Sequence, residues 1–224
     1  MKNNIAAIIL ARGGSKGIKN KNTIKIHGKP LIYWSIKACL NSKKINTVWL
    51  SSDNIQILKL AKKYGAQIIK RPKPISGDRS SSEKAWLHAL KKIQKNYKVQ
   101  TVVGVQPTSP LRPKRSFDEA LSLYSKKKLD SLFTSEKISD HFTWKKINNK
   151  FAANYNYKNR PMRQTIKNCF LENGSFYIFD ANKFLKKKCR LFGKIGTYQM
   201  KKIYSFQIDE KEDIQLFENL KRNF

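Results

Sequence analysis

The sequence predicts an α/β fold with a largely parallel sheet and helices on both of its faces. Short apolar runs alternate with amphipathic segments through the first half of the chain, and polar clusters follow the apolar runs. Strands that alternate with helices form right-handed βαβ units, and such units build parallel sheets. At 224 residues, 40% of them hydrophobic, the chain can form one domain with its own core.

The strands of this sheet are expected where continuous apolar runs end in turns or polar residues. Ile5–Leu10 is the clearest, because it runs directly into a Gly-rich turn. Further strands are expected at Thr47–Ser51, Ala66–Lys70, Thr101–Val105 and Asp130–Ser135.

The helices between these strands are expected where apolar residues recur at helical spacing. Pro30 marks the start of the first helix, Gly65 stops the second, and Ser81 or Ser82 caps the third. Their predicted apolar faces are Ile32/Ile36/Cys39/Leu40, Ile57/Leu60/Ala61/Tyr64, Trp86/Ala89/Leu90/Ile93 and Phe117/Ala120/Leu121/Tyr124.

The pattern changes between about residues 139 and 198, where aromatic residues, Asn, Lys and Gly are mixed without helical period. We interpret this stretch as an insertion within a single domain spanning 1–224, with short strands at Ser175–Phe179 and Gly196–Met200. The main sheet is expected to resume at Ile203–Ile208, and a last helix to begin near Asp213.

Composition narrows the classes of function. The formal charge of +32 favours anionic ligands, but the basic residues are spread along the chain, with no basic tail and no zinc-finger spacing. We therefore expect no nucleic-acid partner. Three scattered cysteines indicate reduced thiols, and no run approaches the roughly 18 apolar residues of a membrane span. We expect a cytoplasmic protein without a membrane partner.

The polar clusters fall where the predicted strands end. In open parallel sheets, ligands bind beyond the carboxyl ends of the strands. A binding site is therefore predicted from the segments that follow them, namely Arg12–Asn22, Asp53, Arg71, Gln106–Arg112 and Asp209.

The loop after the first strand has the chemistry of a phosphate site. It reads Arg12-Gly13-Gly14-Ser15-Lys16-Gly17 and continues to Lys21-Asn22. Glycines let the backbone approach an anion closely, and the cations neutralise phosphate charge. The loop has neither Walker A nor GxGxxG spacing. Its glycines and cations nevertheless predict a nucleoside triphosphate ligand.

The order of these motifs resembles that of the sialic-acid-type cytidylyltransferases, which make CMP-activated nonulosonic acids. The resemblance rests on Ala11–Asn22 with Gly28–Leu31, then Ser51-Ser52-Asp53, Lys62–Ala66, Arg71-Pro72, Ser76-Gly77-Asp78 with Ser81-Ser82, Gln106–Arg112, Arg163-Gln164, Asn173-Gly174 and Ile208-Asp209. The related Kdo cytidylyltransferases usually carry Tyr-Gly-Ser-Thr-Arg in the first loop and fit less well. The resemblance implies a Rossmann-like nucleotide-diphospho-sugar transferase fold with a small dimerisation insertion.

The resemblance also implies roles for individual residues. Arg12, Lys16 and Lys21 would act in catalysis by holding the phosphates. The implied CTP-binding set is Ala11, Arg12, Gly14, Ser15, Lys16, Lys21, Asn22, Arg71 and Ser82. The implied sugar-binding set is Gln106, Arg163, Gln164, Tyr177 and Phe192, although aromatics such as the last two more often lie in a core.

Asp209 is the implied ligand of Mg²⁺, the expected cofactor. The family commonly has Asp-x-Asp here, whereas this chain has Gln207-Ile208-Asp209, so a cage of two aspartates is in doubt. Glu210, Glu212 and Asp213 fit better as acids at a helix start.

The resemblance implies transfer of CMP from CTP to the anomeric hydroxyl of a sialic-acid-like 2-keto sugar acid, carried out by a homodimer. Three alternatives remain open from the sequence: a cytidylyltransferase for another acid such as Kdo, a basic nucleic-acid-binding protein, and a catalytically inactive regulator, which only Gln207 suggests.

Overall fold

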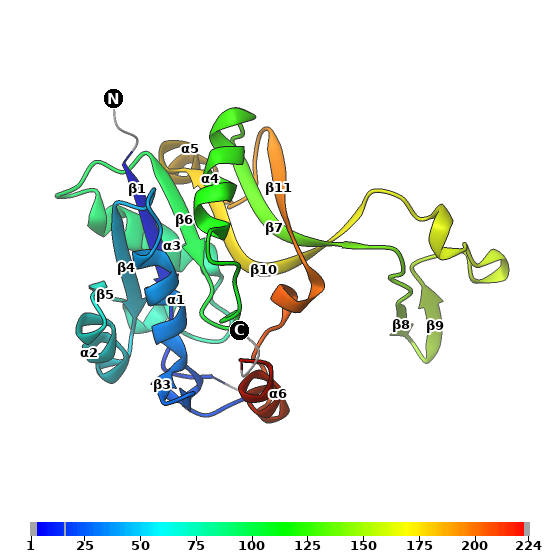
Figure 1. Cartoon of the computed structure of the whole chain (residues 1–224), viewed down its shortest axis with the longest axis horizontal. Coiled ribbons are helices and arrows are strands. Elements are labelled where there is room, and N and C mark those ends of the chain that lie inside the picture. Colours follow the sequence, from blue (N-terminus) through cyan, green and yellow to red (C-terminus); the bar gives the residue numbers. More distant parts are fainter. Residues whose placement is uncertain (1–3, 16, 222–224) are drawn as a thin grey trace.

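A seven-stranded sheet forms the body of the protein (Figure 1). The computed structural model describes residues 4–15 and 17–221. The strand order is β11-β7-β10-β6-β1-β4-β5, and only β10 runs antiparallel to its neighbours. The strands are β1 (Ile5–Leu10), β4 (Thr47–Ser52), β5 (Gln67–Lys70), β6 (Thr101–Val105), β7 (Ser131–Ile138), β10 (Cys169–Asp180) and β11 (Ile195–Met200).

Helices cover both faces of this sheet, because the side chains of each strand alternate between two apolar cores. One core contains side chains of α1 (Leu31–Leu40), α2 (Ile55–Lys63) and α4 (Ser116–Lys126). The other contains side chains of α3 (Ser82–Ile93) and α5 (Ala181–Lys187). The predicted α/β class, with a mostly parallel sheet and helices on both faces, is confirmed.

Local sequence signals place the elements of the first half within one or two residues of their expected bounds. Pro30 immediately precedes α1. Asn54 caps α2 by accepting hydrogen bonds from two backbone N–H groups, and Gly65 follows the end of that helix. Of the two serines expected to cap α3, Ser81 is the N-cap and Ser82 is the first helical residue.

The expected insertion at 139–198 is too long, because its second half, from β10 (Cys169–Asp180) onward, returns to the main sheet and the helix beside it. β10 pairs with both β6 and β7, and β11 pairs with β7. The expected short strands Ser175–Phe179 and Gly196–Met200 lie within β10 and β11. The sequence obscured the first half of β10, because the register shifts at a bulge between Glu172 and Tyr177, where Gly174 has φ +65°. The bulge interrupts the alternation that identifies a strand.

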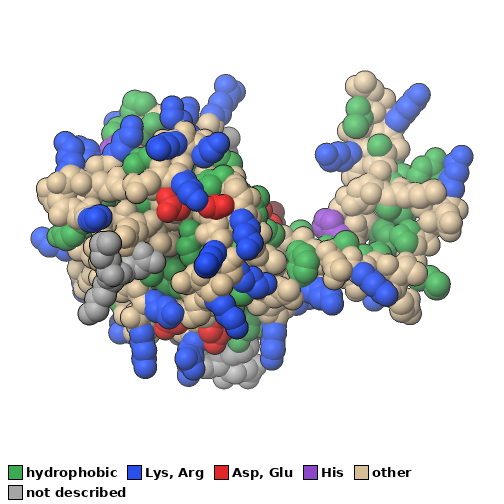
Figure 2. Space-filling model, turned by 90° about the horizontal axis from the view of Figure 1, so that it is seen from above, with side chains coloured by type: hydrophobic (Ala, Val, Ile, Leu, Met, Phe, Trp, Pro, Cys, Tyr) green, Lys and Arg blue, Asp and Glu red, His purple; other side chains and the backbone are tan. Residues whose placement is uncertain are grey.

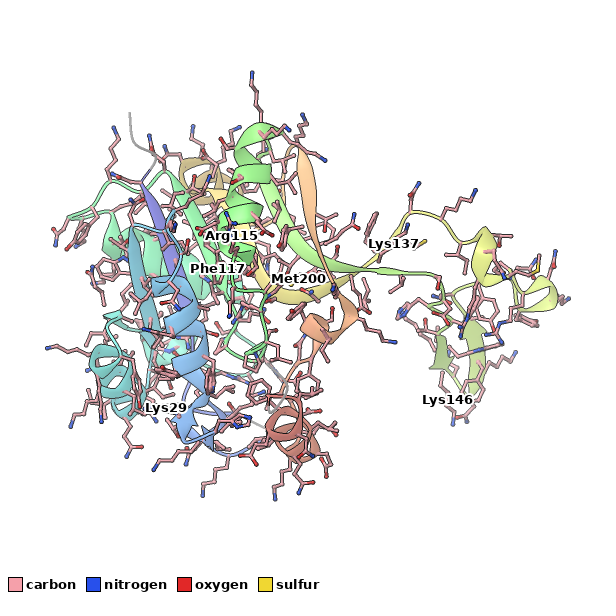
Figure 3. All side chains as sticks on the ribbon, in the orientation of Figure 1. Lys29, Arg115, Phe117, Lys137, Lys146 and Met200 are labelled. Carbon is pink, nitrogen blue, oxygen red and sulfur yellow. The ribbon has the colours of Figure 1, made fainter. Side chains whose placement is uncertain are left out.

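Among the described residues, 139–168 alone leave the body, and they form an extended arm (Figure 1). The arm contains a two-stranded hairpin, β8 (Trp144–Ile147) with β9 (Lys150–Ala153), followed by single 3₁₀ turns at Tyr157–Asn159 and Arg163–Thr165. Lys137 marks the point where β7 leaves the body, and Lys146 lies on the hairpin (Figure 3).

Ile203–Ile208 is not a strand, contrary to expectation. It starts as a 3₁₀ turn (Lys202–Ser205) and then continues without regular structure. The alternating apolar residues that suggested a strand include Ile208, which is fully buried in a third apolar cluster with Leu31 and Phe217. This cluster holds α6 (Lys211–Lys221) near a small hairpin of β2 (Lys25–Ile26) and β3 (Lys29–Pro30).

Within the described part of the chain, no helix is both long and apolar enough to cross a membrane.

Candidate functional site

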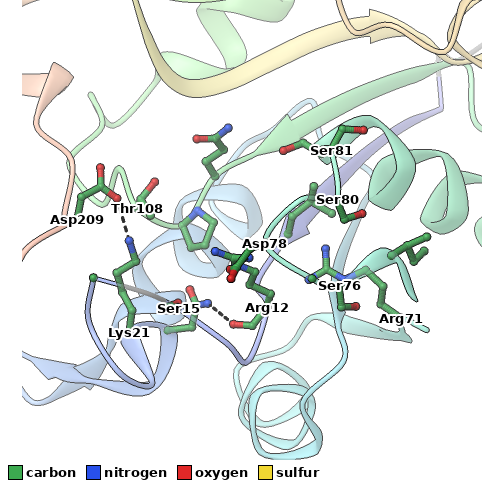
Figure 4. Close-up of a pocket in the computed structure, with 18 residues that line it drawn as sticks. Arg12, Ser15, Lys21, Arg71, Ser76, Asp78, Ser80, Ser81, Thr108 and Asp209 are labelled. Atoms are coloured by element: carbon green, nitrogen blue, oxygen red, sulfur yellow. Dashed lines mark hydrogen bonds and ion pairs between the residues drawn. The ribbon is translucent and has the colours of Figure 1, made fainter. Parts of the chain in front are cut away.

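A pocket of about 490 Å³ opens at the carboxyl ends of the parallel strands (Figure 4). Its volume lies within the usual range for small-molecule sites. It is lined by Leu10, Arg12, Ser15, Gly17, Lys21, Asn22, Arg71, Ile75, Ser76, Gly77, Asp78, Ser80, Ser81, Ser82, Gln106, Pro107, Thr108 and Asp209. The loops after β1, β5 and β6 therefore meet here, as the sequence predicted for a parallel sheet.

The loop after β1 is anchored on one side by Asp53. The backbone N–H of Gly13 donates to Asp53 Oδ1 at 2.9 Å. On the pocket side, Arg12 Nη1 lies 2.6 Å from Asp78 Oδ1 in an ion pair whose side chains are 34% and 43% exposed. One carboxylate thus fixes the loop backbone, and another holds the first cation of the loop.

Lys21 ties the same loop to the C-terminal part of the chain. Its Nζ donates to the carbonyl of Ile208 at 3.0 Å and to Asp209 Oδ1 at 2.8 Å. The Lys21 side chain is only 12% exposed, so the approach of Asp209 neutralises a largely buried cation. Gly17 allows this contact, because a Cβ there would lie 2.4 Å from the Asp209 carbonyl oxygen.

Two buried polar side chains in the pocket have unsatisfied atoms. Arg71 is 6% exposed, and neither its Nε nor its Nη2 has a hydrogen-bond partner. Burial lowers the Arg71 pKa, with Asp53 opposing and Arg12 adding to the effect. Asn22 is 5% exposed, and its Nδ2 donates to the Arg12 carbonyl while its Oδ1 has no partner. A ligand with matching acceptors and donors would satisfy these atoms.

The N-terminus of α3 faces the pocket through Ser81 and Ser82. The partial positive charge of a helix N-terminus favours an anion or a carbonyl group there. Behind this turn, Glu83 pairs with Arg190 Nε at 2.5 Å, and the Arg190 guanidinium lies over the Trp86 ring. The contacts of Arg190 with Glu83 and Trp86 therefore hold the first turn of α3, on which Ser82 lies.

The loop after β6 contributes Gln106 to the pocket and is held in place by Arg112. The Arg112 guanidinium donates to the Gln106 carbonyl, to the Ser35 hydroxyl, and to both the hydroxyl and the carbonyl of Ser175. Burial lowers the Arg112 pKa to about 10. With its donors engaged by the protein, Arg112 has a structural role.

Two of the residues expected to contact a sugar are core residues instead. Tyr177 is 2% exposed, its hydroxyl donates to Glu172, and its ring packs edge-on against Trp86. Phe192 is 9% exposed within the same core cluster. Neither lines the pocket, so their expected role in sugar contact has no support in this geometry. Large aromatic side chains gain most by complete burial, and that outcome prevailed here.

Arg163 and Gln164 lie on the arm and do not line the pocket either. Arg163 pairs with Asp140 at 2.6 Å, and its side chain is 72% exposed. Within one chain, the structure does not bring these two residues to the predicted site.

Most of the predicted CTP-binding residues line the pocket, and three do not or lie outside the described residues. Arg12, Ser15, Lys21, Asn22, Arg71 and Ser82 all line the pocket. Ala11 is fully buried in the core beneath the loop, and Gly14 is exposed and does not line the pocket. Lys16 lies outside the described residues.

Ser76, Asp78 and Thr108 line the pocket, although sequence reasoning assigned them no role. A signal existed, since all three belong to segments that carried the family resemblance. They lie in loops after β5 and β6, whose conformation no periodicity predicts. Their place in the pocket lining therefore depends on loop conformations that the sequence pattern does not report.

A metal ion would find few protein ligands in the pocket. Among residues 4–15 and 17–221, no three His, Cys, Asp or Glu side chains gather into a cation site. Asp209 offers an exposed carboxylate, whereas the Gln207 amide donates to the Asn173 carbonyl at 2.8 Å. Asp213 Oδ2 accepts hydrogen bonds from the backbone N–H groups of residues 209 and 210, as expected for an acid at a helix start. Mg²⁺ is commonly bound by one carboxylate together with substrate phosphates, so Asp209 fits that mode.

Comparison with known proteins identifies the family. The family model described as cytidylyltransferase matches residues 6–223. The chain belongs to the cytidylyltransferase family. The resemblance drawn from the motifs is thereby confirmed, and the pocket described above is the candidate active site of a cytidylyltransferase.

Curated relatives of this cytidylyltransferase chain include N-acylneuraminate cytidylyltransferases. The Danio rerio enzyme A is 36% identical over 92% of this chain, and the enzyme of Escherichia coli O18:K1:H7 is 32% identical over 96%. The chain spans about half the length of both, 48% and 52%. The post-translational flagellin modification protein B of Campylobacter coli is 30% identical over 96% of this chain and 94% of its own length.

Solved structures share the fold. A CMP:2-keto-3-deoxy-manno-octonic acid synthetase complexed with CTP superposes with a TM-score of 0.72 over 98% of this chain and 99% of that one, at 14% identity. A 4-diphosphocytidyl-2C-methyl-D-erythritol synthase gives a TM-score of 0.73 at 8% identity, with 98% and 99% covered. The predicted Rossmann-like fold is confirmed.

Proposed function

We propose that the protein transfers CMP from CTP to the anomeric hydroxyl of a nonulosonic acid, giving a CMP-sugar and pyrophosphate. One observation carries the proposal: in a cytidylyltransferase chain, a buried guanidinium with unpaired N–H groups faces a pocket lined by two further cations. This arrangement suits a ligand that combines hydrogen-bonding acceptors with phosphates.

CTP would lie with its base toward Arg71, Asn22 and Ser82. The unpaired N–H groups of Arg71 are donors, and the unpaired Oδ1 of Asn22 is an acceptor. Cytosine carries a carbonyl, a ring nitrogen and an amino group, so it offers both complementary functions. The base would therefore satisfy polar atoms whose burial is otherwise unfavourable.

The phosphates would lie along the loop after β1. Arg12 and Lys21, together with Lys16, would bind the triphosphate and stabilise the pyrophosphate leaving group. Arg12 and Lys21 would have to exchange Asp78 and Asp209 for phosphate oxygens. The sugar hydroxyl would attack the α-phosphorus in line, forming the new P–O bond as the bond to pyrophosphate breaks. The hydroxyl loses its proton as the new P–O bond forms.

Mg²⁺ is the proposed cofactor, held by the Asp209 carboxylate together with nucleotide phosphates. Bound in this way, it would neutralise charge on the phosphates. Gln207 would take no part, since it does not line the pocket and its Nε2 donates to the Asn173 carbonyl.

The sugar acid would contact Gln106 and, from a second copy of the chain, Arg163 and Gln164. The arm carries exposed apolar side chains, including Trp144, Phe151 and Met162, at 47%, 66% and 67% exposure. Figure 2 shows hydrophobic side chains gathered on the arm, which stands apart from the body. Such a surface favours protein contact, so we propose a homodimer in which the arm of one chain reaches the pocket of the other.

The test is a substrate panel. Purified protein with CTP and Mg²⁺ should release pyrophosphate when a nonulosonic acid is added, and the product mass should equal that of the CMP-sugar. Folded protein that is silent with every acid in the panel would contradict the proposal.

The same assay distinguishes the nearer alternative, a cytidylyltransferase for Kdo. The fold is shared with the CTP-bound synthetase described above and so does not separate the two activities. Turnover with Kdo and none with nine-carbon acids would favour that reading. The nucleic-acid alternative predicts salt-dependent binding to random DNA and no stabilisation by CTP.

A further inference from the structure

The two carboxylates of the pocket are each placed against one of its cations. Asp78 pairs with Arg12, and Asp209 pairs with Lys21. Among the described residues that line the pocket, these are the only acids. In a chain with 47 basic and 15 acidic residues, acids are scarce, so an acid within an anion site calls for a reason.

Asp209 already has a proposed use, but Asp78 has none. It lies in the turn between β5 and α3, where the Ser80 N–H donates to the Gly77 carbonyl. Its carboxylate contacts Nη1 of Arg12, which also lines the pocket, and its side chain is 43% exposed (Figure 4). Because solvent reaches both side chains of this ion pair, the pair itself contributes only weakly to stability.

A phosphate and the Asp78 carboxylate cannot both keep this contact without a penalty. Each offers anionic oxygens to the same nitrogen, and two anions on one guanidinium repel each other. Since a triphosphate carries more charge than a carboxylate, it would win the contact when bound. The free energy needed to break the Asp78–Arg12 ion pair would then lower the affinity of the triphosphate.

We propose that Asp78 is an internal counterion of Arg12, holding the phosphate-binding guanidinium while the pocket is empty and competing with nucleotide phosphates and pyrophosphate. It is a positioning residue that acts through Arg12 and weakens the binding of both anions, which favours release of pyrophosphate after the transfer. The inference rests on the proposed function, because it takes CTP as the ligand.

The experiment measures dissociation constants of CTP and of inorganic pyrophosphate by calorimetry at low salt. Asp78→Asn should bind both about five- to tenfold more tightly than the wild type, the size expected when one partly exposed ion pair and one repulsion are removed together. Asp78→Glu, which retains the charge, should stay close to the wild type. Glu218→Gln removes the same charge from an exposed position on α6 and should change neither constant more than about twofold.

A double-mutant cycle tests whether Asp78 acts through Arg12. In an Arg12→Gln background, Asp78→Asn should lose most of its effect. If Asp78→Asn, in a chain that keeps Arg12, bound CTP and pyrophosphate no more tightly than the wild type, the inference would be overturned. The proposed function would remain intact. A folded wild-type protein that binds neither CTP nor pyrophosphate would contradict the proposed function, and this inference with it.

Discussion

At the residue scale, the buried Arg71 guanidinium is expected to favour CTP binding and to disfavour the stability of the unliganded protein. Its guanidinium is buried with two nitrogens unpaired, which is unfavourable in the empty protein. Arg71→Met should leave the free energy of unfolding of the unliganded protein unchanged or raised, while weakening CTP binding about 10- to 100-fold through loss of charged hydrogen bonds.

Thermal unfolding with and without CTP measures both effects of Arg71→Met. Arg71→Lys is the control, because it keeps the charge and loses the planar donor set. Equal CTP affinity in the wild type and Arg71→Met would show that the unpaired nitrogens do not serve the nucleotide.

Glu83 offers a second test at this scale, through pH. Although burial opposes ionisation, the hydrogen bond and charge of Arg190 hold the Glu83 pKa below its ordinary value. A carboxyl whose pKa is lowered on folding stabilises the fold above its unfolded pKa, and this contribution disappears as pH falls through the folded pKa. Between about pH 5 and 3, the wild type should lose stability more steeply than Glu83→Gln, by roughly 1 kcal/mol. Parallel pH profiles of the two proteins in urea would contradict this.

At the element scale, the contact between the loop after β1 and the segment before α6 depends on Gly17. A methyl group there would overlap the Asp209 carbonyl, which belongs to backbone and cannot rotate away. Gly17→Ala should therefore cost about 1–3 kcal/mol of stability and separate Lys21 from Asp209. Gly14→Ala in the same loop is the control, since a Cβ there meets nothing within 4 Å. Equal denaturation midpoints for both variants would show that the two segments move freely.

The same scale shows how far the sequence could predict this fold and where it could not. Helical spacing and buried apolar runs identified the strands of the main sheet and the α-helices from β1 to the start of β7, but not the short β2–β3 hairpin. The bulge at Gly174 concealed the first half of β10, and alternation at Ile203–Ile208 suggested a strand where Ile208 enters a separate cluster. Periodicity reports which side chains are buried, but not which partner buries them.

Prediction of the site followed the same division. Positions fixed by a strand end, such as Arg12, Arg71 and Gln106, reached the pocket as expected. Tyr177 did not, because an aromatic residue on a central strand faces whichever core its register dictates. Asp78 lies on an irregular turn, and its pairing with Arg12 required the folded structure.

At the scale of the whole molecule, the arm is separable from the sheet. Ile138 and Cys169 are direct partners in the β7–β10 ladder, so the chain leaves and re-enters the body at adjacent points. Replacing residues 139–168 with Asn-Gly would close these strands with a favoured two-residue turn. The shortened chain should fold and bind CTP, since no described residue that lines the pocket lies on the arm.

If the arm joins two copies and completes the sugar site, the shortened chain should be monomeric and fail to turn over. Light scattering after gel filtration, CTP binding and pyrophosphate release measure these properties separately. Arg163→Ala in the full-length chain is the companion variant, expected to stay dimeric while losing affinity for the acidic sugar rather than for CTP. A shortened chain that remains dimeric, or that keeps full turnover, would place both the interface and the sugar-binding groups on the body. Loss of CTP binding in a folded shortened chain would instead mean that the arm supports the nucleotide pocket, contrary to the separation of arm and pocket within one chain.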